Sequence, residues 1–380
     1  MTEWKSYKLA DVCSRLRSGK TISATSVSPN GKYAVIGGNG VRGYTEKSNF
    51  KGQCVVVGRQ GAYCGNVRYF DGEFYMTEHA VVIVGNEYAN THYLAYLLST
   101  MELGHLSAQS AQPGLSIQTL SKLEIYLPPL SQQQRIVNLL GALDHKIEIN
   151  RRINDNLEQQ AQALYKSWFV DFEPFKDSDF VESDLGLIPK GWSTGSIYKY
   201  VNVIYGAPYK STLFNENKEG YPLIRIRDLK TFSPQFYTTE VLPQTEYIKS
   251  GDVVAGMDAE FIPCLWQGET GVLNQRCCKF VGKDKEINNL FVLHLVKPEL
   301  EYVQSYKTGT TVSHLGKADI DRFIVILPDE AIVHQFSKIC RPLLDEQNKC
   351  AIEIRRLTNL RDALLPKLMS GELKINDLDC

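Results

Sequence analysis

Apolar residues recur along residues 131–168 with the alternating four- and three-residue steps of a coiled-coil seam. The seam positions are Ile136, Leu140, Leu143, Ile147, Asn150, Asn154, Leu157, Ala161, Leu164 and Trp168. Asn150 and Asn154 interrupt the apolar run at its middle, and buried asparagines at such positions fix helix register at a cost in stability. Ser131 with Gln134 predicts a capping box at the start. The pattern predicts a helix roughly 55 Å long.

A second long helix is predicted over residues 330–370, with a rougher seam. Its apolar positions are Ile332, Phe336, Ile339, Leu343, Cys350, Ile354, Leu357, Leu364 and Leu368. Gln347 and Arg361 stand where apolar residues are expected, and Pro342 predicts a kink or a nearby break. We favour antiparallel pairing of the two helices into a coiled coil. The alternative is that each helix is an amphipathic core helix of an ordinary domain.

The remaining chain shows the short apolar runs of β-strands separated by turns. Strands are predicted at YAVIGG, QCVVVG, NVRYF and AVVIVG in the first part, and at YPLIRIRDL, DVVAG and RCCKFVG in the second. One helix is predicted in each part, over residues 91–100 and 289–298. The fold class is therefore α+β, with globular domains at 1–130 and 190–329, a central helix and linker at 131–189, and a distal helix at 330–380.

The chain also repeats itself. KYAVIGGNGV at 32–41 pairs with GYPLIRIRDL at 220–229, KGQCVV at 51–56 with SGDVVA at 250–255, and LSKLEIYLP at 120–128 with IDRFIVILP at 320–328. The offset drifts from 188 to 200 residues and then stays constant into the helices, where Leu139 corresponds to Ile339. Two like units related by a pseudo-two-fold axis would carry their globular domains at opposite ends of the helix pair.

Composition narrows the class of protein without naming a partner. The 380 residues are 43% hydrophobic and 10% aromatic, which suits two packed domains. No apolar run reaches membrane-spanning length, and the polar N-terminal stretch is not a secretory signal. Nine cysteines without a CxxC pair are typical of cytoplasmic thiols. The net charge of −1 does not by itself suggest DNA.

Motifs that would indicate catalysis or a cofactor are weak. Gly38, Gly40 and Gly43 have the spacing of a dinucleotide fingerprint, but no amphipathic helix follows them. SGKT at 18–21 lacks the glycine and the flanking elements of a phosphate-binding loop. His79 beside Glu78, and the MDAE run at 257–260, are interpreted as solvated or locally hydrogen-bonded groups. We expect no catalytic residue and no metal site in this chain.

The doubled order of motifs resembles the specificity subunit of type I restriction-modification systems. The first copy carries W-x4-L, SGKT, KGQCVV, YLAYLL and LEIYLPPLSQQQRI, and the second repeats the order with GWSTGSI, YPLIRIRDL, KSGDVV and FIVILP. The resemblance covers essentially the whole chain, although no single motif is highly specific. The second copy departs from this pattern at two places near the start of its helix, with LPDE in place of LPPL and with Pro342.

The resemblance implies a subunit that has no catalytic residues of its own. Two target recognition domains would each read one half of a split, asymmetric site in double-stranded DNA, and the helices would set the spacing and dock two methyltransferase subunits. S-adenosylmethionine would bind to the methyltransferase subunits, and restriction subunits are a further partner that the sequence leaves open. The resemblance also implies a cytoplasmic protein with no membrane partner.

Candidate DNA contacts are basic and amide side chains in the segments that differ between the copies. They are Lys20, Arg42, Tyr44, Arg59, Gln60 and Arg68 in the first domain, and Lys210, Arg225, Arg227, Arg276 and Lys279 in the second. Candidate positions for the coiled coil or a partner are Ile136, Leu143, Asn150, Asn154, Leu157, Leu164, Phe336, Leu343, Ile354, Leu357 and Leu364. The competing hypotheses are a coiled-coil scaffold whose ends bind protein or glycan, and a self-contained methyltransferase or nuclease.

Overall fold

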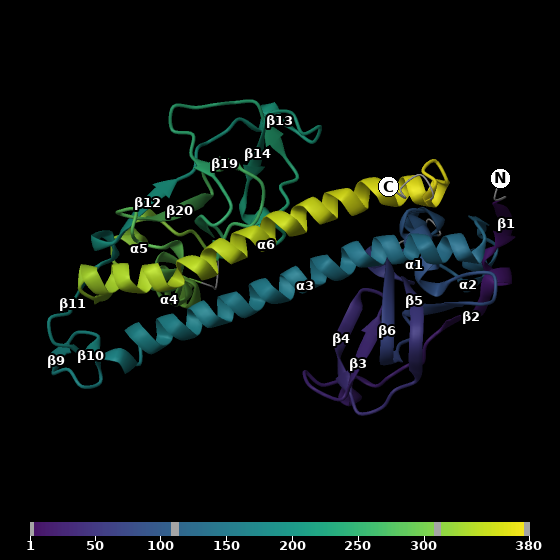
Figure 1. Cartoon of the computed structure of the whole chain (residues 1–380), viewed down its shortest axis with the longest axis horizontal. Helices are drawn as coiled ribbons and strands as arrows, with labels where there is room; N and C mark the ends of the chain where they lie inside the picture. Colours follow the sequence, from purple (N-terminus) through teal and green to yellow (C-terminus); the bar gives the residue numbers. More distant parts are fainter. Residues whose placement is uncertain (1–3, 108–113, 308–312, 376–380) are drawn as a thin grey trace. The chain divides into compact units, whose positions relative to one another are not determined.

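The computed structural model describes residues 4–107, 114–307 and 313–375 (Figure 1). The chain divides into two compact units. The first unit holds residues 1–145 and 358–380, and the second holds residues 146–357. Both long helices therefore pass from one unit into the other. The α+β fold class predicted from the sequence is confirmed.

A six-stranded sheet forms the body of the first unit, in the order β2-β7-β5-β6-β3-β4. The strands are β2 (Cys13–Ser18), β7 (Ala80–Gly85), β5 (Phe50–Gly58), β6 (Val67–Met76), β3 (Tyr33–Gly37) and β4 (Gly40–Thr45). Neighbours are antiparallel except β3 and β6, which are parallel. A separate antiparallel pair joins β1 (Lys5–Lys8) to β8 (Glu124–Leu127). All four strands predicted in this part of the chain are present.

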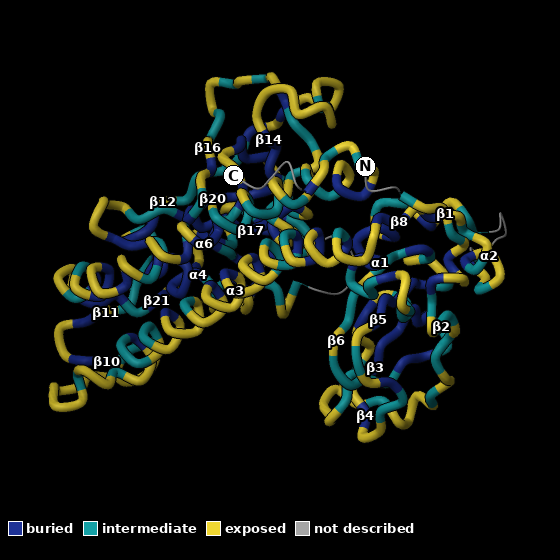
Figure 2. The backbone as a smooth tube through the Cα atoms, turned by 45° about the vertical axis from the view of Figure 1, so that its right-hand side comes forward, coloured by how far each residue is buried: buried dark blue, intermediate teal, exposed yellow. Residues whose placement is uncertain are grey.

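Helix α1 (Thr91–Ser99) packs on this sheet and is followed by the short α2 (Ile117–Ser121). The side chain of Asn90 accepts hydrogen bonds from the amides of His92 and Tyr93 and so caps the first turn of α1. Apolar residues of β5 and β7 form a buried core with α1, and most of β5 is dark blue in Figure 2. Burial of this face is what holds the helix on the sheet.

The second unit has a smaller central sheet in the order β12-β20-β17-β18. Its strands are β12 (Val201–Tyr205), β20 (Cys277–Gly282), β17 (Val253–Gly256) and β18 (Cys264–Leu265). A five-stranded sheet, β13-β15-β14-β19-β16, comprises β13 (Phe214–Asn215), β15 (Tyr237–Thr238), β14 (Tyr221–Ile224), β19 (Gly271–Leu273) and β16 (Tyr247–Ile248). Two further pairs join β9 (Phe180–Ser183) to β10 (Gly186–Pro189) and β11 (Ser193–Ser196) to β21 (Ile324–Leu327).

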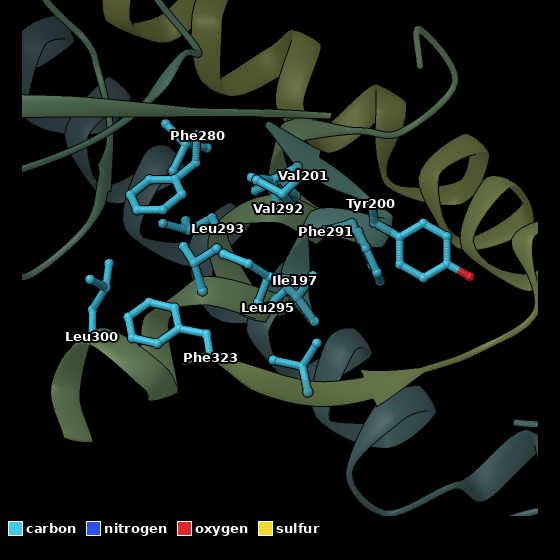
Figure 3. Close-up of a cluster of buried hydrophobic side chains, with 14 of the residues drawn as sticks. Ile197, Tyr200, Val201, Phe280, Phe291, Val292, Leu293, Leu295, Leu300 and Phe323 are labelled. Atoms are coloured by element: carbon cyan, nitrogen blue, oxygen red, sulfur yellow. The ribbon is translucent and has the colours of Figure 1, made fainter. Parts of the chain in front are cut away.

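Two predictions for this unit need correction. The strand expected over YPLIRIRDL ends at Ile224, where the chain turns into a 3-10 helix (Ile226–Leu229). Helix α4 (Asn289–Lys307) is longer than expected and continues through Pro298. Its buried residues, with Phe280 and Phe323, form the core in Figure 3, so packing outweighs the local cost of proline. The short helix α5 (Lys317–Ile320) follows.

The long helices are α3 (Leu130–Phe169, 40 residues) and α6 (Glu330–Ser370, 41 residues). In the first unit, Ile136 and Leu140 of α3 share a core with Leu368 of α6. In the second unit, Phe169 of α3 shares a core with Phe336 of α6. The start of each helix therefore packs beside the end of the other, which confirms the antiparallel pairing.

Details of both helices differ from the sequence prediction. Helix α3 begins at Leu130, and the amides of Gln132 and Gln133 donate to the carbonyl of Pro129, so Ser131 is not the cap. Helix α6 runs without a break through Pro342, which is exposed. Ile339, expected in the seam, is 46% exposed. No helix among the described residues is long and apolar enough to span a membrane.

Candidate nucleic-acid interface

Three predicted DNA contacts of the first unit lie around one end of its sheet. Arg59 and Gln60 directly follow β5, and the amide of Arg59 donates to the carbonyl of His79 (3.1 Å). The Gln60 Oε1 lies 3.1 Å from the His79 Nδ1. The Arg59 guanidinium lies 3.5 Å from the Ser18 hydroxyl. Arg68, on β6, donates to the Asn39 side chain (3.3 Å).

The turn between β3 and β4 adds a further arginine. Gly37 lies against the side chain of Arg42, since a Cβ at Gly37 would come within 2.5 Å of it. Gly40, with φ of +103°, faces the guanidinium of Arg68. Gly40, one of the glycines with the dinucleotide-like spacing, therefore lies with Gly37 in a tight turn where two arginine side chains approach the backbone. Arg42 and Arg68 are both exposed.

Lys20 and Tyr44 also lie at the surface of the first unit. The amide of Lys20 donates to the carbonyl of Met76 (2.9 Å), which fixes the backbone, and its side chain is exposed. Tyr44 is 37% exposed. An open hollow of about 640 Å³ adjoins Arg68. It is lined in part by Asn39, Tyr63, Asn66, Arg68 and His105.

The structure separates the predicted contacts of the second unit into surface and interior groups. Lys210 and Arg227 are exposed. Arg276 is 57% exposed, and its guanidinium lies 3.0 Å from the Asp258 carboxylate. Arg225 is only 19% exposed and stacks over the Phe236 ring, at 4.3 Å from its centroid.

Lys279 is 8% exposed, on the central strand β20. Its ammonium lies 2.8 Å from Glu246 and 3.1 Å from Asp252. Burial alone would lower the pKa of Lys279, but the hydrogen bond to Glu246 and the charge of Asp252 outweigh it and raise the pKa. Lys279 is therefore buried and Arg225 is mostly covered, so neither side chain lies on the surface of the unit with the other predicted DNA contacts.

The two asparagines in the seam of α3 differ in whether they have a hydrogen-bond partner among the described residues. In the second unit, the Asn150 amide donates to Glu353 (2.8 Å), and Lys146 lies 3.6 Å from the same carboxylate. Asn154 is 5% exposed, and neither atom of its amide has a hydrogen-bond partner among the described residues. The other predicted seam positions are buried or half-buried, namely Ile136, Leu143, Leu157, Leu164, Phe336, Leu343, Ile354, Leu357 and Leu364.

Arg361, which appeared misplaced in the seam, has a partner in the first unit. Its guanidinium donates to Asp144 of α3 (2.9 Å), and the Tyr96 hydroxyl of α1 donates to the same carboxylate (2.5 Å). Burial, then the hydrogen bond to Asp144, raises the pKa of Tyr96. The distal helix is thereby joined to the central helix and to α1 by charged hydrogen bonds.

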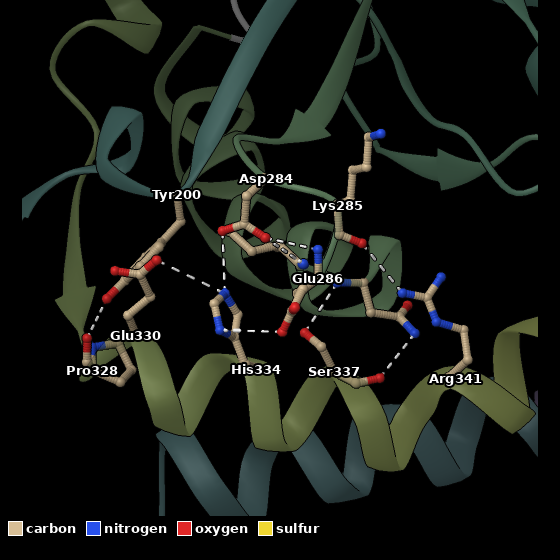
Figure 4. A network of polar contacts seen from close by, with 11 residues as sticks. Tyr200, Asp284, Lys285, Glu286, Pro328, Glu330, His334, Ser337 and Arg341 are labelled. Atoms are coloured by element: carbon tan, nitrogen blue, oxygen red, sulfur yellow. Dashed lines mark hydrogen bonds and ion pairs between the residues drawn. The ribbon is translucent and has the colours of Figure 1, made fainter.

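A polar cluster at the start of α6 has the residue types of a metal site. Ligand atoms of Asp284, Glu330 and His334 lie within 4.8 Å of one another. The His334 Nε2 lies 3.1 Å from Asp284, and its Nδ1 lies 3.6 Å from Glu286 (Figure 4). All three carboxylates are exposed, and they satisfy the imidazole by themselves. The cluster joins α6 to the loop after β20.

Buried thiols have no reactive character. Burial raises the pKa of Cys13, Cys54 and Cys278 to about 12, so these groups stay protonated near neutral pH.

Sequence reasoning missed several surface groups beside the predicted contacts. Asn39 and His314 were not considered, and His79 and Asp258 were interpreted only as solvated or locally hydrogen-bonded groups. The divergence between GRQGAYCGN at 58–66 and GMDAEFIPC at 256–264 could have singled out Asp258. The other three residues lie outside these segments and come beside them only in the folded chain.

Comparison with known proteins gives a consistent result. A family model described as the type I restriction modification DNA specificity domain matches residues 1–159 and again residues 189–356. The MjaIX specificity subunit of Methanocaldococcus jannaschii, a type I restriction enzyme subunit, is 28% identical over 320 residues, covering 76% of this chain and 70% of the relative. The HindI specificity subunit of Haemophilus influenzae is 25% identical and covers 98% of this chain and 100% of the relative. The crystal structure of a type I S subunit from M. genitalium has the same fold, with a TM-score of 0.60 at 17% identity over 97% of this chain and 96% of that chain.

Proposed function

The chain belongs to the family of type I restriction-modification DNA specificity domains, and we propose that it reads a DNA target in two separate parts. Each unit carries most of one copy of the domain, and the loops that follow matching strands differ between the copies. Two unlike readers on one chain specify two unlike half-sites, so the target is asymmetric. The duplicated domain with divergent loops is the observation that carries the proposal.

The decisive experiment exchanges one of the two target recognition domains. The full chain is assembled with methyltransferase subunits, and methylated bases are mapped in the modified DNA. Replacing residues 1–130 with those of a relative should change one half-site and leave the other intact. An unchanged target would support the alternative of a scaffold whose end domains bind protein or glycan.

We propose that α3 and α6 fix the separation of the half-sites. Each helix is continuous through the boundary between the units, and an α-helix rises 1.5 Å per residue. One heptad inserted into α3 after His145 and another into α6 after Leu357 preserves the seam pattern and adds about 10 Å, or about three base pairs of duplex. The mapped spacer should lengthen accordingly. An unchanged spacer would contradict the role of the helices as a ruler.

The helices also offer a surface for the methyltransferase subunits. Ile149 and Ile153 of α3 are each 36% exposed, and with Leu157 they line a shallow groove on the second unit. Exposed apolar residues on a paired helix are typical of a protein interface. Ile153→Glu should weaken association with the methyltransferase in size-exclusion chromatography, whereas Arg151→Glu, at an exposed residue of α3 outside the lining of the groove, should have little effect. Equal association of both variants with wild type would place the interface elsewhere.

Catalysis is assigned to the partners. S-adenosylmethionine would bind to the methyltransferase subunits, with restriction subunits as additional partners of the assembled complex in the cytoplasm. The purified chain should neither bind S-adenosylmethionine in calorimetry nor methylate DNA. Methyl transfer by the chain alone would overturn this assignment.

A further inference from the structure

The two units contain the same backbone junction beside their sheets. In the first unit, the amide of Arg59 donates to the carbonyl of His79 (3.1 Å), and the amide of Leu115 donates to the carbonyl of Arg59 (2.9 Å). Gln60 forms an isolated antiparallel bridge with Gly114. Three segments far apart in the sequence thus meet where β5 ends and β7 begins.

The second unit repeats this hydrogen-bond pattern where β17 ends and β20 begins. The amide of Met257 donates to the carbonyl of Arg276 (2.8 Å), and the amide of Leu315 donates to the carbonyl of Met257 (2.7 Å). Asp258 forms the isolated antiparallel bridge, here with His314. The backbone correspondence therefore pairs Gln60 with Asp258, His79 with Arg276 and Gly114 with His314.

The side chains at these matched positions differ in chemistry but not in arrangement. In the first junction, the exposed Gln60 amide is held by His79 at 3.1 Å, and His79 is held by Glu78 at 3.2 Å. The His79 side chain is 43% exposed. An amide fixed by an imidazole is therefore presented to solvent.

In the second junction, a recessed carboxylate holds an exposed guanidinium. The Asp258 side chain is 18% exposed, and one of its oxygens lies 3.0 Å from the Arg276 guanidinium. The other oxygen lies 2.7 Å from the His314 Nδ1. Arg276 is 57% exposed, so a carboxylate beneath the surface orients a fork of donors toward solvent.

We propose that these matched junctions are the base-reading positions of the two domains, with Gln60 reading adenine in one half-site and Arg276 reading guanine in the other. The inference rests on the proposed function. A carboxamide pairs in a bidentate manner with the adenine edge, and a guanidinium pairs with the guanine O6 and N7. Gln60 corresponds to Asp258 and Arg276 corresponds to His79, so each domain presents its reading side chain from a different position of the shared junction, which accounts for two different half-sites.

The contacts of Gln60 with His79 and of Asp258 with Arg276 contribute little to the stability of the fold, so substitutions there test DNA recognition separately from folding. Ion pairs with an exposed partner contribute little to stability. Arg276→Gln, Arg276→Lys and Gln60→Ala should therefore leave the thermal unfolding curve close to that of wild type.

The experiment uses the full chain assembled with its methyltransferase subunits. The complex selects sites from a library in which every position of the wild-type target is randomised, and the selected DNA is sequenced. Arg276→Gln should lose the preference for guanine at one position of one half-site by about 5- to 150-fold, the range of a single bidentate contact. Arg276→Lys keeps the charge but not the planar fork, so it should lose less of the preference for guanine than Arg276→Gln. Gln60→Ala should lose the preference for adenine in the other half-site only.

Two further variants sharpen the test. Asp258→Asn removes the charge that orients Arg276 and should weaken discrimination at that same guanine position. Lys190→Gln is the matched control, because Lys190 and Asp179 form an exposed ion pair of the same length (3.0 Å) outside the junction. It should select the wild-type target.

The outcomes separate this inference from the function on which it rests. If the wild-type complex selects no bipartite site, the proposed function fails. If wild type selects such a site and the Arg276 and Gln60 variants select the same one, only the base-reading inference fails. Uniform weakening at all sequences would show phosphate contacts and would also overturn it.

Discussion

The buried amide of Asn154 provides a test of how the helix seam is stabilised. Its side chain is 5% exposed without a hydrogen-bond partner among the described residues, whereas Asn150, one turn earlier, donates to Glu353. An unpaired buried amide costs about 1 to 3 kcal/mol. Leucine at this position would remove that cost and add apolar burial, less about 1 kcal/mol for imperfect fit. We expect Asn154→Leu to raise the free energy of unfolding by about 2 kcal/mol.

The assay is urea denaturation of the full chain, followed by far-ultraviolet circular dichroism and by tryptophan fluorescence. Asn150→Leu is the matched comparison, and it should be neutral or lose about 1 kcal/mol because it removes a donor from Glu353. A lower midpoint for Asn154→Leu, with an unchanged slope, would refute the reasoning and show that the amide is satisfied.

The same variant separates stability from specificity. Lys146 with Glu353, in the second unit, and Arg361 with Asp144, in the first, also fix the helix register. The spacer mapped with the Asn154→Leu complex should therefore equal that of wild type. A changed spacer would show that the asparagine itself specifies register.

Three further predictions concern groups that the structure places in the interior. Lys279→Met should lower the free energy of unfolding by about 3 to 5 kcal/mol in urea denaturation, because it leaves the carboxylates of Glu246 and Asp252 without their cation. A loss below about 1 kcal/mol would contradict the burial of this charged cluster. Burial, with a smaller effect of the neighbouring Lys297, lowers the pKa of His294 from 6.5 to about 4. The unfolded chain therefore binds the proton at a higher pH than the folded chain does. The free energy of unfolding should fall by up to about 3 kcal/mol as the pH drops from 6.5 toward 4. His294→Phe should flatten that part of the curve of unfolding free energy against pH, and an identical slope for both proteins would exclude the histidine. Arg361→Met should cost about 1 to 2 kcal/mol in thermal unfolding and increase hydrogen exchange at the end of α6, while unaltered exchange there would show that the ion pair contributes nothing.

Figure 4 shows the polar cluster at the start of α6. Ligand atoms of Asp284, Glu330 and His334 lie within 4.8 Å of one another, and the imidazole is hydrogen-bonded to Asp284. The neighbouring amide of Asn288 donates to the Ser337 hydroxyl (3.0 Å), which attaches the start of α6 to α4. The arrangement is explained by helix attachment.

The sequence by itself determined those features of the protein that follow from the spacing of apolar residues along the chain. The seam of α3, the duplication and the alternating strands β5 and β7 recur at fixed spacing, so local burial requirements predict them directly. The antiparallel pairing followed because two equivalent helices of one chain must bury their seams against each other. The helix expected to end at residue 298 continues through Pro298, and α6 has no break at Pro342. Packing of the buried helix faces compensates a local cost that the sequence pattern cannot weigh.

Only the tertiary structure decided which polar groups meet. Lys279 looked like a surface cation, and its burial depends on Glu246 and Asp252, each more than 25 residues away in sequence. Gln60 and His79 come together only because β5 and β7 pair side by side, and Asp258 reaches Arg276 by the corresponding pairing of β17 and β20. Periodicity fixes which face of an element is buried, whereas contacts between side chains depend on long-range register, which no local pattern contains.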